Sequence, residues 1–145
     1  MQEVVGDLWS YQGQGVLVLT TNGSLTRDGR AVLGRGCARQ AGERFSDLPQ
    51  RLGARLQAGG NHVHELGDNL VSFPVEETAW SHPDPRLIRR SAEELRALVD
   101  ASGYALVVVP RPGCGFGGLN WLEVRPLLAD LFDQRFLVIS APEAG

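Results

Sequence analysis

Three continuous apolar runs rich in β-branched residues stand out along the chain, at residues 15–21, 104–110 and 135–140. A strand with one face in water alternates apolar and polar residues, so runs without alternation predict strands buried on both faces, as in a mainly parallel sheet covered by helices. Shorter strands are expected at 3–5, 62–66 and 69–73, the last two joined by a Gly67-Asp68 turn.

Apolar residues at helical spacing predict helices between these strands. One helix is expected after the cap candidates Ser46 and Asp47, with Gly59-Gly60 ending it, and a second runs from Pro85 to Gly103. The resulting order of elements, β-β-α-α-β-β-α-β-α-β, indicates an α/β fold.

The start of the last predicted helix carries two conflicting signals. Asn120 and Glu123 have the spacing of a capping box. Pro126 follows within one turn, and an interior proline deletes a backbone hydrogen bond. The sequence therefore predicts either an irregular first turn or a helix that begins later.

Length and composition narrow the class of protein. A chain of 145 residues suits a single domain spanning 1–145. Cys37 and Cys114 lie far apart with no signal-like start, which favours reduced thiols and a cytoplasmic setting. No apolar run has the length of a bilayer, so no membrane partner is expected.

The charge inventory excludes several mechanisms. All 14 basic residues are arginine, so a Schiff-base lysine and a Walker-type phosphate lysine cannot exist in this chain. The net charge of −3 predicts no strong general affinity for nucleic acid, and any bound anion must be met by backbone amides or placed arginines.

Two glycine-rich loops, at 20–38 and 110–121, each follow a core strand and lead into a helix, with an Asp28-Gly29 turn in the first. Open α/β folds bind ligands at this edge of the sheet. Residues without a Cβ let backbone amides approach an anion, and a helix start adds free N–H groups, so a phosphate or diphosphate site is one interpretation and plain connections are the other. A dinucleotide fingerprint fits poorly, because Arg39 stands where its third glycine belongs.

Four segments in order resemble the macrodomain family over essentially the full length: Val5-Gly6-Asp7-Leu8, Thr20-Thr21-Asn22-Gly23, Leu33-Gly34-Arg35-Gly36-Cys37-Ala38, and 112–121 (PGCGFGGLNW). The resemblance is strongest to bacterial and phage macrodomains near the antitoxin and terminal ADP-ribose glycohydrolase branch. It implies a three-layer α/β/α fold with a mixed, mainly parallel sheet, and ADP-ribose as the ligand.

The resemblance also implies a set of ligand-binding residues. Asp7 matches the carboxylate that accepts a hydrogen bond from the adenine amine, and Leu8 the adjoining backbone contact. Thr21 and Asn22 match the strand end beside the distal ribose. The two loops match the segments around the diphosphate and distal ribose, which carries over Gly34, Arg35, Gly36, Cys37, Gly113, Cys114, Gly115, Phe116, Gly117, Gly118 and Leu119.

From the residues alone, several of these positions have ordinary structural interpretations. Asp7 could equally be a turn or cap residue, and Asn22 a left-handed turn residue before Gly23. Phe116 could lie over the ribose as a lid or anchor its loop in the core.

Catalysis by the machinery of the glycohydrolase branch is excluded. That branch uses a lysine and an aspartate, whereas residues 72–78 hold no lysine and Gly117 or Gly118 stands at the aspartate position. Two routes stay open: a water activated by the ligand's own phosphate and ribose, with Asn22 as the catalytic candidate that positions the ribose, or a carboxylate base, Asp28 or Glu76, if one enters the cleft. For Glu76 and Glu77, the favoured interpretation is that both are solvated surface charges outside the cleft.

Other chemistry-bearing residues have simpler explanations. Cys114 lacks a recognisable histidine partner, so packing is favoured over a nucleophile. His62 and His64 share a predicted strand face but lack further ligands, so surface histidines are favoured over a metal pair. Trp121 is expected to pack, while Trp9 and Trp80 belong to the core or an adenine pocket. A run at Arg86, Arg89 and Arg90 is expected to be a solvated helix face rather than a basic partner patch.

These observations lead to one functional expectation and two alternatives. The chain is expected to bind ADP-ribose and to hydrolyse it from a modified protein or nucleic-acid acceptor without a lysine, cofactor or metal. The first alternative is a non-catalytic reader of the modification. The second is an unrelated nucleotide-binding fold.

Overall fold

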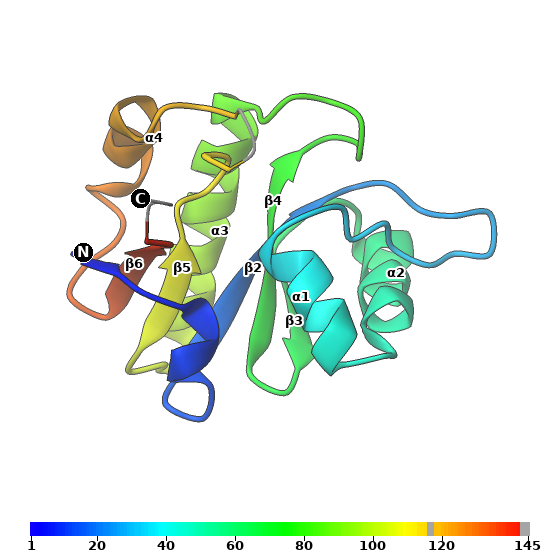
Figure 1. Ribbon diagram of the computed structural model, residues 1–145, viewed down its shortest axis with the longest axis horizontal. Helices are drawn as coiled ribbons and strands as arrows, with labels where there is room; N and C mark the ends of the chain where they lie inside the picture. Colours follow the sequence, from blue (N-terminus) through cyan, green and yellow to red (C-terminus); the bar gives the residue numbers. More distant parts are fainter. Residues whose placement is uncertain (116–117, 143–145) are drawn as a thin grey trace.

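The computed structural model describes residues 1–115 and 118–142 as six strands, four α-helices and one 3₁₀ helix (Figure 1). The elements, in chain order, are β1 (Gln2–Val5), η1 (Leu8–Tyr11), β2 (Val16–Asn22), α1 (Cys37–Arg44), α2 (Leu48–Gly59), β3 (His64–Gly67), β4 (Leu70–Glu76), α3 (Pro85–Ser102), β5 (Val107–Pro110), α4 (Trp121–Leu128) and β6 (Phe136–Ser140). The predicted order of strands and α-helices is confirmed, and η1 is an addition that the apolar pattern did not predict.

All six strands form one sheet in the order β1-β6-β5-β2-β4-β3. The pairs β1–β6, β6–β5, β5–β2 and β2–β4 are parallel, and only β3 runs antiparallel to its neighbour. The mixed, mainly parallel sheet is therefore confirmed. The apolar runs lie in β2, β5 and β6, which are buried on both faces as expected.

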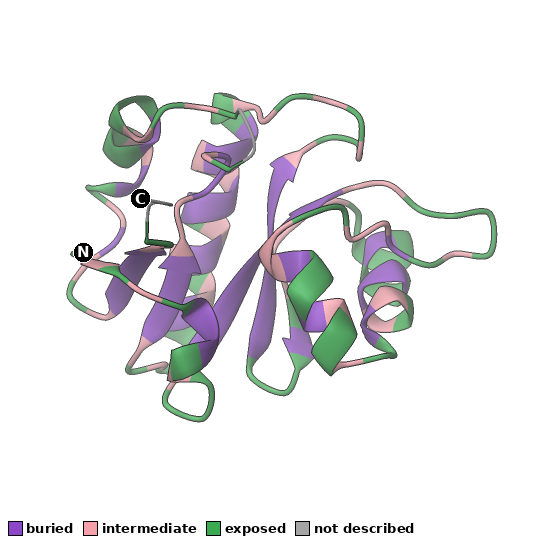
Figure 2. Cartoon of the chain, in the orientation of Figure 1, coloured by how far each residue is buried: buried purple, intermediate pink, exposed green. Residues whose placement is uncertain are grey.

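A hydrophobic core on each face of the sheet makes the structure three-layered. One core joins the sheet to α3 and α4, around Phe73, Phe132 and Phe136. The other joins the opposite face to η1, α1 and α2, around Leu19 and Leu48. The four inner strands β2, β4, β5 and β6 are buried along most of their length, whereas the edge strands β1 and β3 and the outer surfaces of the helices are largely exposed (Figure 2).

Three local expectations change in detail. The β3–β4 turn is Asp68-Asn69, one residue later than predicted, because both residues adopt positive φ (53° and 58°), as a two-residue turn between antiparallel strands requires. The last helix begins at Trp121, where the capping signal placed it: Asn120 accepts a hydrogen bond from the Leu122 amide at 2.9 Å. Pro126 is tolerated because this helix ends at Leu128.

Candidate functional site

A cleft of about 1270 Å³ runs along the edge of the sheet where the parallel strands end. This is larger than the roughly 300–1,000 Å³ usual for small-molecule pockets. Its described lining comes mainly from the ends of five strands and the segments just beyond them: 6–8 beyond β1, 20–22 and 33–37 at and beyond the end of β2, residues 75, 76, 79 and 81–83 at and beyond the end of β4, residues 110, 111, 113–115 and 118–121 at and beyond the end of β5, and 139–142 around the end of β6. Open α/β sheets place their ligands at this edge.

The cleft has two distinct ends. Asp7 follows β1, the edge strand, whereas Glu76 ends β4, four intervals away in the strand order. Adjacent strands lie about 4.8 Å apart, which separates these two ends by about 19 Å. The arrangement suits a long ligand whose middle lies between the two glycine loops.

The first glycine loop leads into α1. Gly34 and Gly36 have φ of +70° and +72°, which favours glycine at both positions. Their N–H groups bond to no other described residue, and α1 begins at the next residue, Cys37, which also lines the cleft. Unbonded amides at a helix start form a cradle for an anion.

Asn22 fixes the base of this loop from the end of β2. Its Nδ2 donates to the Val32 carbonyl at 2.9 Å, and its Oδ1 accepts from the Ser24 amide at 2.9 Å. Asn22 is not a left-handed turn residue, because positive φ among described non-glycine residues occurs only at Asp68 and Asn69. An amide side chain still has one N–H and one lone pair for a ligand, so the structure places Asn22 in the cleft wall mainly as a loop anchor.

The second glycine loop follows β5. Gly113 has φ of +71°, and its carbonyl accepts from the Leu119 amide at 2.7 Å, which closes the loop on itself. Gly118 packs so closely against that carbonyl that a Cβ would collide with it. Gly115 differs, because a Cβ there would meet nothing within 4 Å. Phe116 and Gly117 lie outside the described residues.

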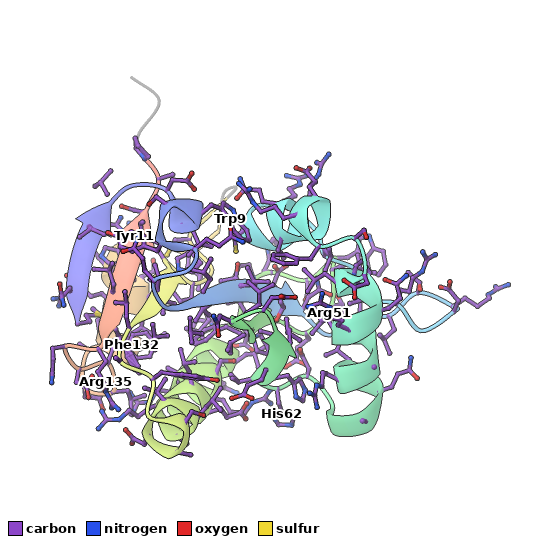
Figure 3. All side chains as sticks on the ribbon, turned by 90° about the horizontal axis from the view of Figure 1, so that it is seen from below. Trp9, Tyr11, Arg51, His62, Phe132 and Arg135 are labelled. Atoms are coloured by element: carbon purple, nitrogen blue, oxygen red, sulfur yellow. The ribbon has the colours of Figure 1, made fainter. Side chains whose placement is uncertain are left out.

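At the other end of the cleft, Asp7 caps η1. Its Oδ1 accepts from the Trp9 amide at 3.1 Å, and its second oxygen bonds to no described residue. Asp7 can therefore cap η1 with one carboxylate oxygen and still offer the other oxygen to a ligand. Trp9 does not line the cleft: it is buried between η1 and α1, where its Nε1 donates to Gln40 at 2.8 Å and the Arg44 guanidinium lies 4.4 Å from the ring centre (Figure 3).

Arg111 and Trp121 form a stacked pair in the cleft wall that could not be predicted from the sequence. The Arg111 guanidinium lies 4.9 Å from the ring centre of Trp121, whose Nε1 donates to Glu3 at 3.0 Å. Both Arg111 and Trp121 line the cleft. The ten-residue separation of the pair gave no periodic signal.

Of the two carboxylates considered as general bases, one lies outside the cleft and the other lines it. Asp28 sits at the exposed tip of the 25–31 hairpin, paired with Arg30 at 3.0 Å, and does not line the cleft. Glu76 does line it, and burial raises the pKa of its carboxyl, against a smaller lowering by His82. Glu76 was expected on balance to be a surface charge; it is instead a partly buried wall residue, because β4 continues three residues beyond the predicted 69–73 strand.

The cysteines and histidines have structural partners. Burial raises the pKa of both the Cys37 and the Cys114 thiol, which keeps them protonated and unreactive near neutral pH. His62 pairs with Glu94 at 2.7 Å, and His64 contacts the Gly60 carbonyl at 2.9 Å. No group of potential metal ligands occurs among residues 1–115 and 118–142.

The remaining candidates lie on the surface. Arg89 pairs with Asp130 at 2.6 Å and Arg90 with Glu94 at 3.5 Å, so these arginines are engaged in ion pairs on and beside α3. Trp80 is 84% exposed on the loop that borders the cleft and belongs to neither core. In the part of the chain that the structure describes, no helix is both long and apolar enough to cross a membrane.

Thirteen of the fifteen residues that the resemblance assigned to ligand binding fall in the described segments, and all thirteen line this one cleft: Asp7, Leu8, Thr21, Asn22, Gly34, Arg35, Gly36, Cys37, Gly113, Cys114, Gly115, Gly118 and Leu119. They come from segments more than 100 residues apart. Their convergence is a property of the fold, and their roles in binding stay predictions.

Comparison with known proteins points to one fold. The macrodomain of Thermus aquaticus DarG superimposes with a TM-score of 0.78 at 20% identity, covering 98% of this chain and 97% of that one. Thermosipho africanus DarTG in complex with ADP-ribose gives a TM-score of 0.77 at 18% identity, covering all of this chain and 43% of the larger protein.

A sequence comparison agrees. The ADP-ribose glycohydrolase OARD1 of Bos taurus is 22% identical over 102 residues, which is 70% of this chain and 67% of that protein. A scan against protein-family models found no match. With the sheet order, the three layers and the cleft between two glycine loops, these likenesses show that the chain has the macrodomain fold.

Proposed function

We propose that this chain binds ADP-ribose in the cleft, with adenine at the Asp7 end and the distal ribose at the Glu76 end. The observation that carries the proposal is the row of glycine amides without partners in the middle of a cleft about 19 Å long. Such amides neutralise a diphosphate without lysine. The complex of DarTG with ADP-ribose, a protein of the same fold, supports the choice of ligand.

Each end of the cleft offers a fitting polar group. The free oxygen of Asp7 can accept from an exocyclic amine, and the neighbouring Leu8 is buried against the core. Asn22 retains hydrogen-bonding capacity toward ribose hydroxyl groups. Between them, Arg35 and Arg111 line the cleft and supply positive charge near the proposed diphosphate position.

We further propose that the bound ADP-ribose is the product of a hydrolysis that releases it from a protein or nucleic-acid acceptor. The sequence similarity to OARD1, an ADP-ribose glycohydrolase, supports this activity. The lysine-free sequence requires a route in which no lysine takes part. The competing function is a reader that binds the modification and leaves it intact.

Titration calorimetry against ADP-ribose, ADP, NAD and ATP tests the binding proposal. ADP-ribose is expected to bind tightest because it alone fits both ends and has no extra group on the distal ribose. Tighter binding of NAD or ATP would overturn the proposal in favour of a different nucleotide. Release of free ADP-ribose from ADP-ribosylated protein or DNA during an overnight incubation supports the hydrolase, and intact substrate supports the reader.

A further inference from the structure

The end of β4 departs from regular pairing in a way that concerns Glu76. Thr21 of β2 pairs with Pro74, but the register then shifts, so Asn22 lies opposite Glu76 and Val75 has no partner across the pair. Irregularities of this kind re-aim a side chain and are frequent beside active sites. Val75 packs into the core below α3 and also borders the cleft, and Glu76 lines the cleft without joining either core.

The backbone around Glu76 is held firmly. Asn61 Nδ2 donates to the Glu76 carbonyl at 3.1 Å, and the Gly23 amide donates to the Glu77 carbonyl at 3.2 Å. Gly23 and Asn61 are themselves in close contact, since a Cβ on Gly23 would press on the Asn61 amide. Position 76 is therefore fixed relative to Asn22 and the base of the first glycine loop.

The Glu76 carboxylate, in contrast, has no hydrogen bond or ion pair with any described residue. Most acidic groups of this chain pair with an arginine, such as Asp47 with Arg51 and Asp130 with Arg89. Burial and the exposed His82 are the influences on the Glu76 carboxyl, and burial is the larger. A fixed, partly desolvated carboxylate with unused lone pairs is a competent proton acceptor.

We propose that Glu76 is the general base of a hydrolysis at this end of the cleft, an assignment that rests on the proposed function. Glu76 removes a proton from a water molecule as the water oxygen bonds to the anomeric carbon of the distal ribose. The bond from that carbon to the acceptor breaks, and its electron pair leaves with the acceptor. The proton passes from Glu76 to the departing acceptor or to solvent, which restores the carboxylate.

Among the described carboxylates and thiols, no other group is placed for this role. Asp7 is the only other carboxylate in the lining, and it lies about 19 Å away at the opposite end. Asp28 is outside the cleft, and the two thiols are held protonated by burial. His82 also lines the cleft and is exposed, so it is the competing base at this end, and an unchanged rate of Glu76→Gln would favour it.

The test compares Glu76→Gln with Glu77→Gln, a matched control. Glu77 is the neighbouring residue, is exposed and does not line the cleft. With ADP-ribosylated protein and ADP-ribosylated DNA as substrates, Glu76→Gln is expected to lower kcat by about 10²- to 10⁴-fold, the range for loss of a general base, while Glu77→Gln keeps the wild-type rate. ADP-ribose affinity, measured by calorimetry, is expected to fall in neither variant.

A pH profile of the wild-type protein adds a readout that does not depend on any variant. The rate should rise with pH as Glu76 ionises and then level off, with the midpoint above the ordinary value for a glutamate because burial raises the pKa of this carboxyl. The residual rate of Glu76→Gln should lack this rise. The same profile in both proteins, or equal rates, would overturn the assignment.

Calorimetry separates the two possible failures. If ADP-ribose binds but neither substrate is hydrolysed by the wild-type protein, Glu76 is not a base and the binding proposal stands with the reader function. If ADP-ribose does not bind at all, the proposed function fails and the assignment of Glu76 fails with it.

Discussion

Gly115 offers a direct test of the amide cradle. It lines the cleft in the second glycine loop, its φ is not positive, and a Cβ there would meet no atom within 4 Å. Gly115→Val therefore adds three carbon atoms at the cleft wall, and the first of them meets no atom of the described residues. Gly36→Val would be a poorer probe, because the positive φ of Gly36 strains any side chain.

The expected effects on binding and on stability differ in size. If the Gly115 amide bonds a phosphate oxygen, blocking that approach removes a hydrogen bond to a charged group, which is worth about 1.5–3 kcal/mol, or about 10- to 150-fold in Kd. The free energy of unfolding should change by no more than about 0.5 kcal/mol, as for other substitutions at open positions.

Calorimetry with ADP-ribose and urea denaturation of the same two proteins measure both quantities. Gly115→Ala provides an intermediate step, since its single methyl group should weaken binding less than the valine side chain. Wild-type affinity in a correctly folded Gly115→Val protein would refute close approach of a ligand to this loop, and with it the diphosphate position.

Three further substitutions test other parts of the structure. Asp7→Asn keeps a side-chain oxygen for the η1 cap but loses the second acceptor, so ADP-ribose affinity measured by calorimetry should fall by about 1.5–3 kcal/mol; unchanged affinity would count against adenine at this end. Gly53→Ala in α2 pushes on the Gly29 carbonyl of the hairpin and should lower the free energy of unfolding by about 1–3 kcal/mol in urea; full stability would show that the hairpin yields. Asp133, bonded to Arg135, has its pKa lowered from 3.8 to about 2, so its ionised form stabilises the fold above pH 4 and this contribution is lost as the pH falls toward 2; Asp133→Asn should flatten the decline of Tm across that interval, and an unchanged slope would contradict the pairing.

The sheet and both loops could be predicted because their signals are local. Buried parallel strands need continuous apolar runs, and the runs at β2, β5 and β6 have no competing interpretation. Glycine at Gly34, Gly36 and Gly113 marked loops of unusual backbone geometry, and all three adopt positive φ.

Features that depend on distant partners could not be predicted. The hydrogen bonds of Asn22 join residues up to ten positions apart, and nothing in the pattern distinguishes such an anchor from a turn residue. The place of Glu76 in the cleft wall depends on where β4 ends and on which neighbouring segments close around it, and the pattern of that one strand does not carry this information. The short helix η1 could not be predicted from the sequence, because a helix of four residues is too short to show a repeating apolar pattern.

The order of the strands also divides recognition of a ligand into two halves. Asp7 and Glu76 are mounted on strands too far apart for a single mononucleotide to reach both, so AMP and ribose 5-phosphate would each engage one half only. A covalent pyrophosphate makes capture of the second half an intramolecular event, which raises affinity beyond that of either fragment. If ADP-ribose binds as proposed, the width of the sheet would therefore favour a joined, two-sugar ligand over the separate pieces from which it is assembled.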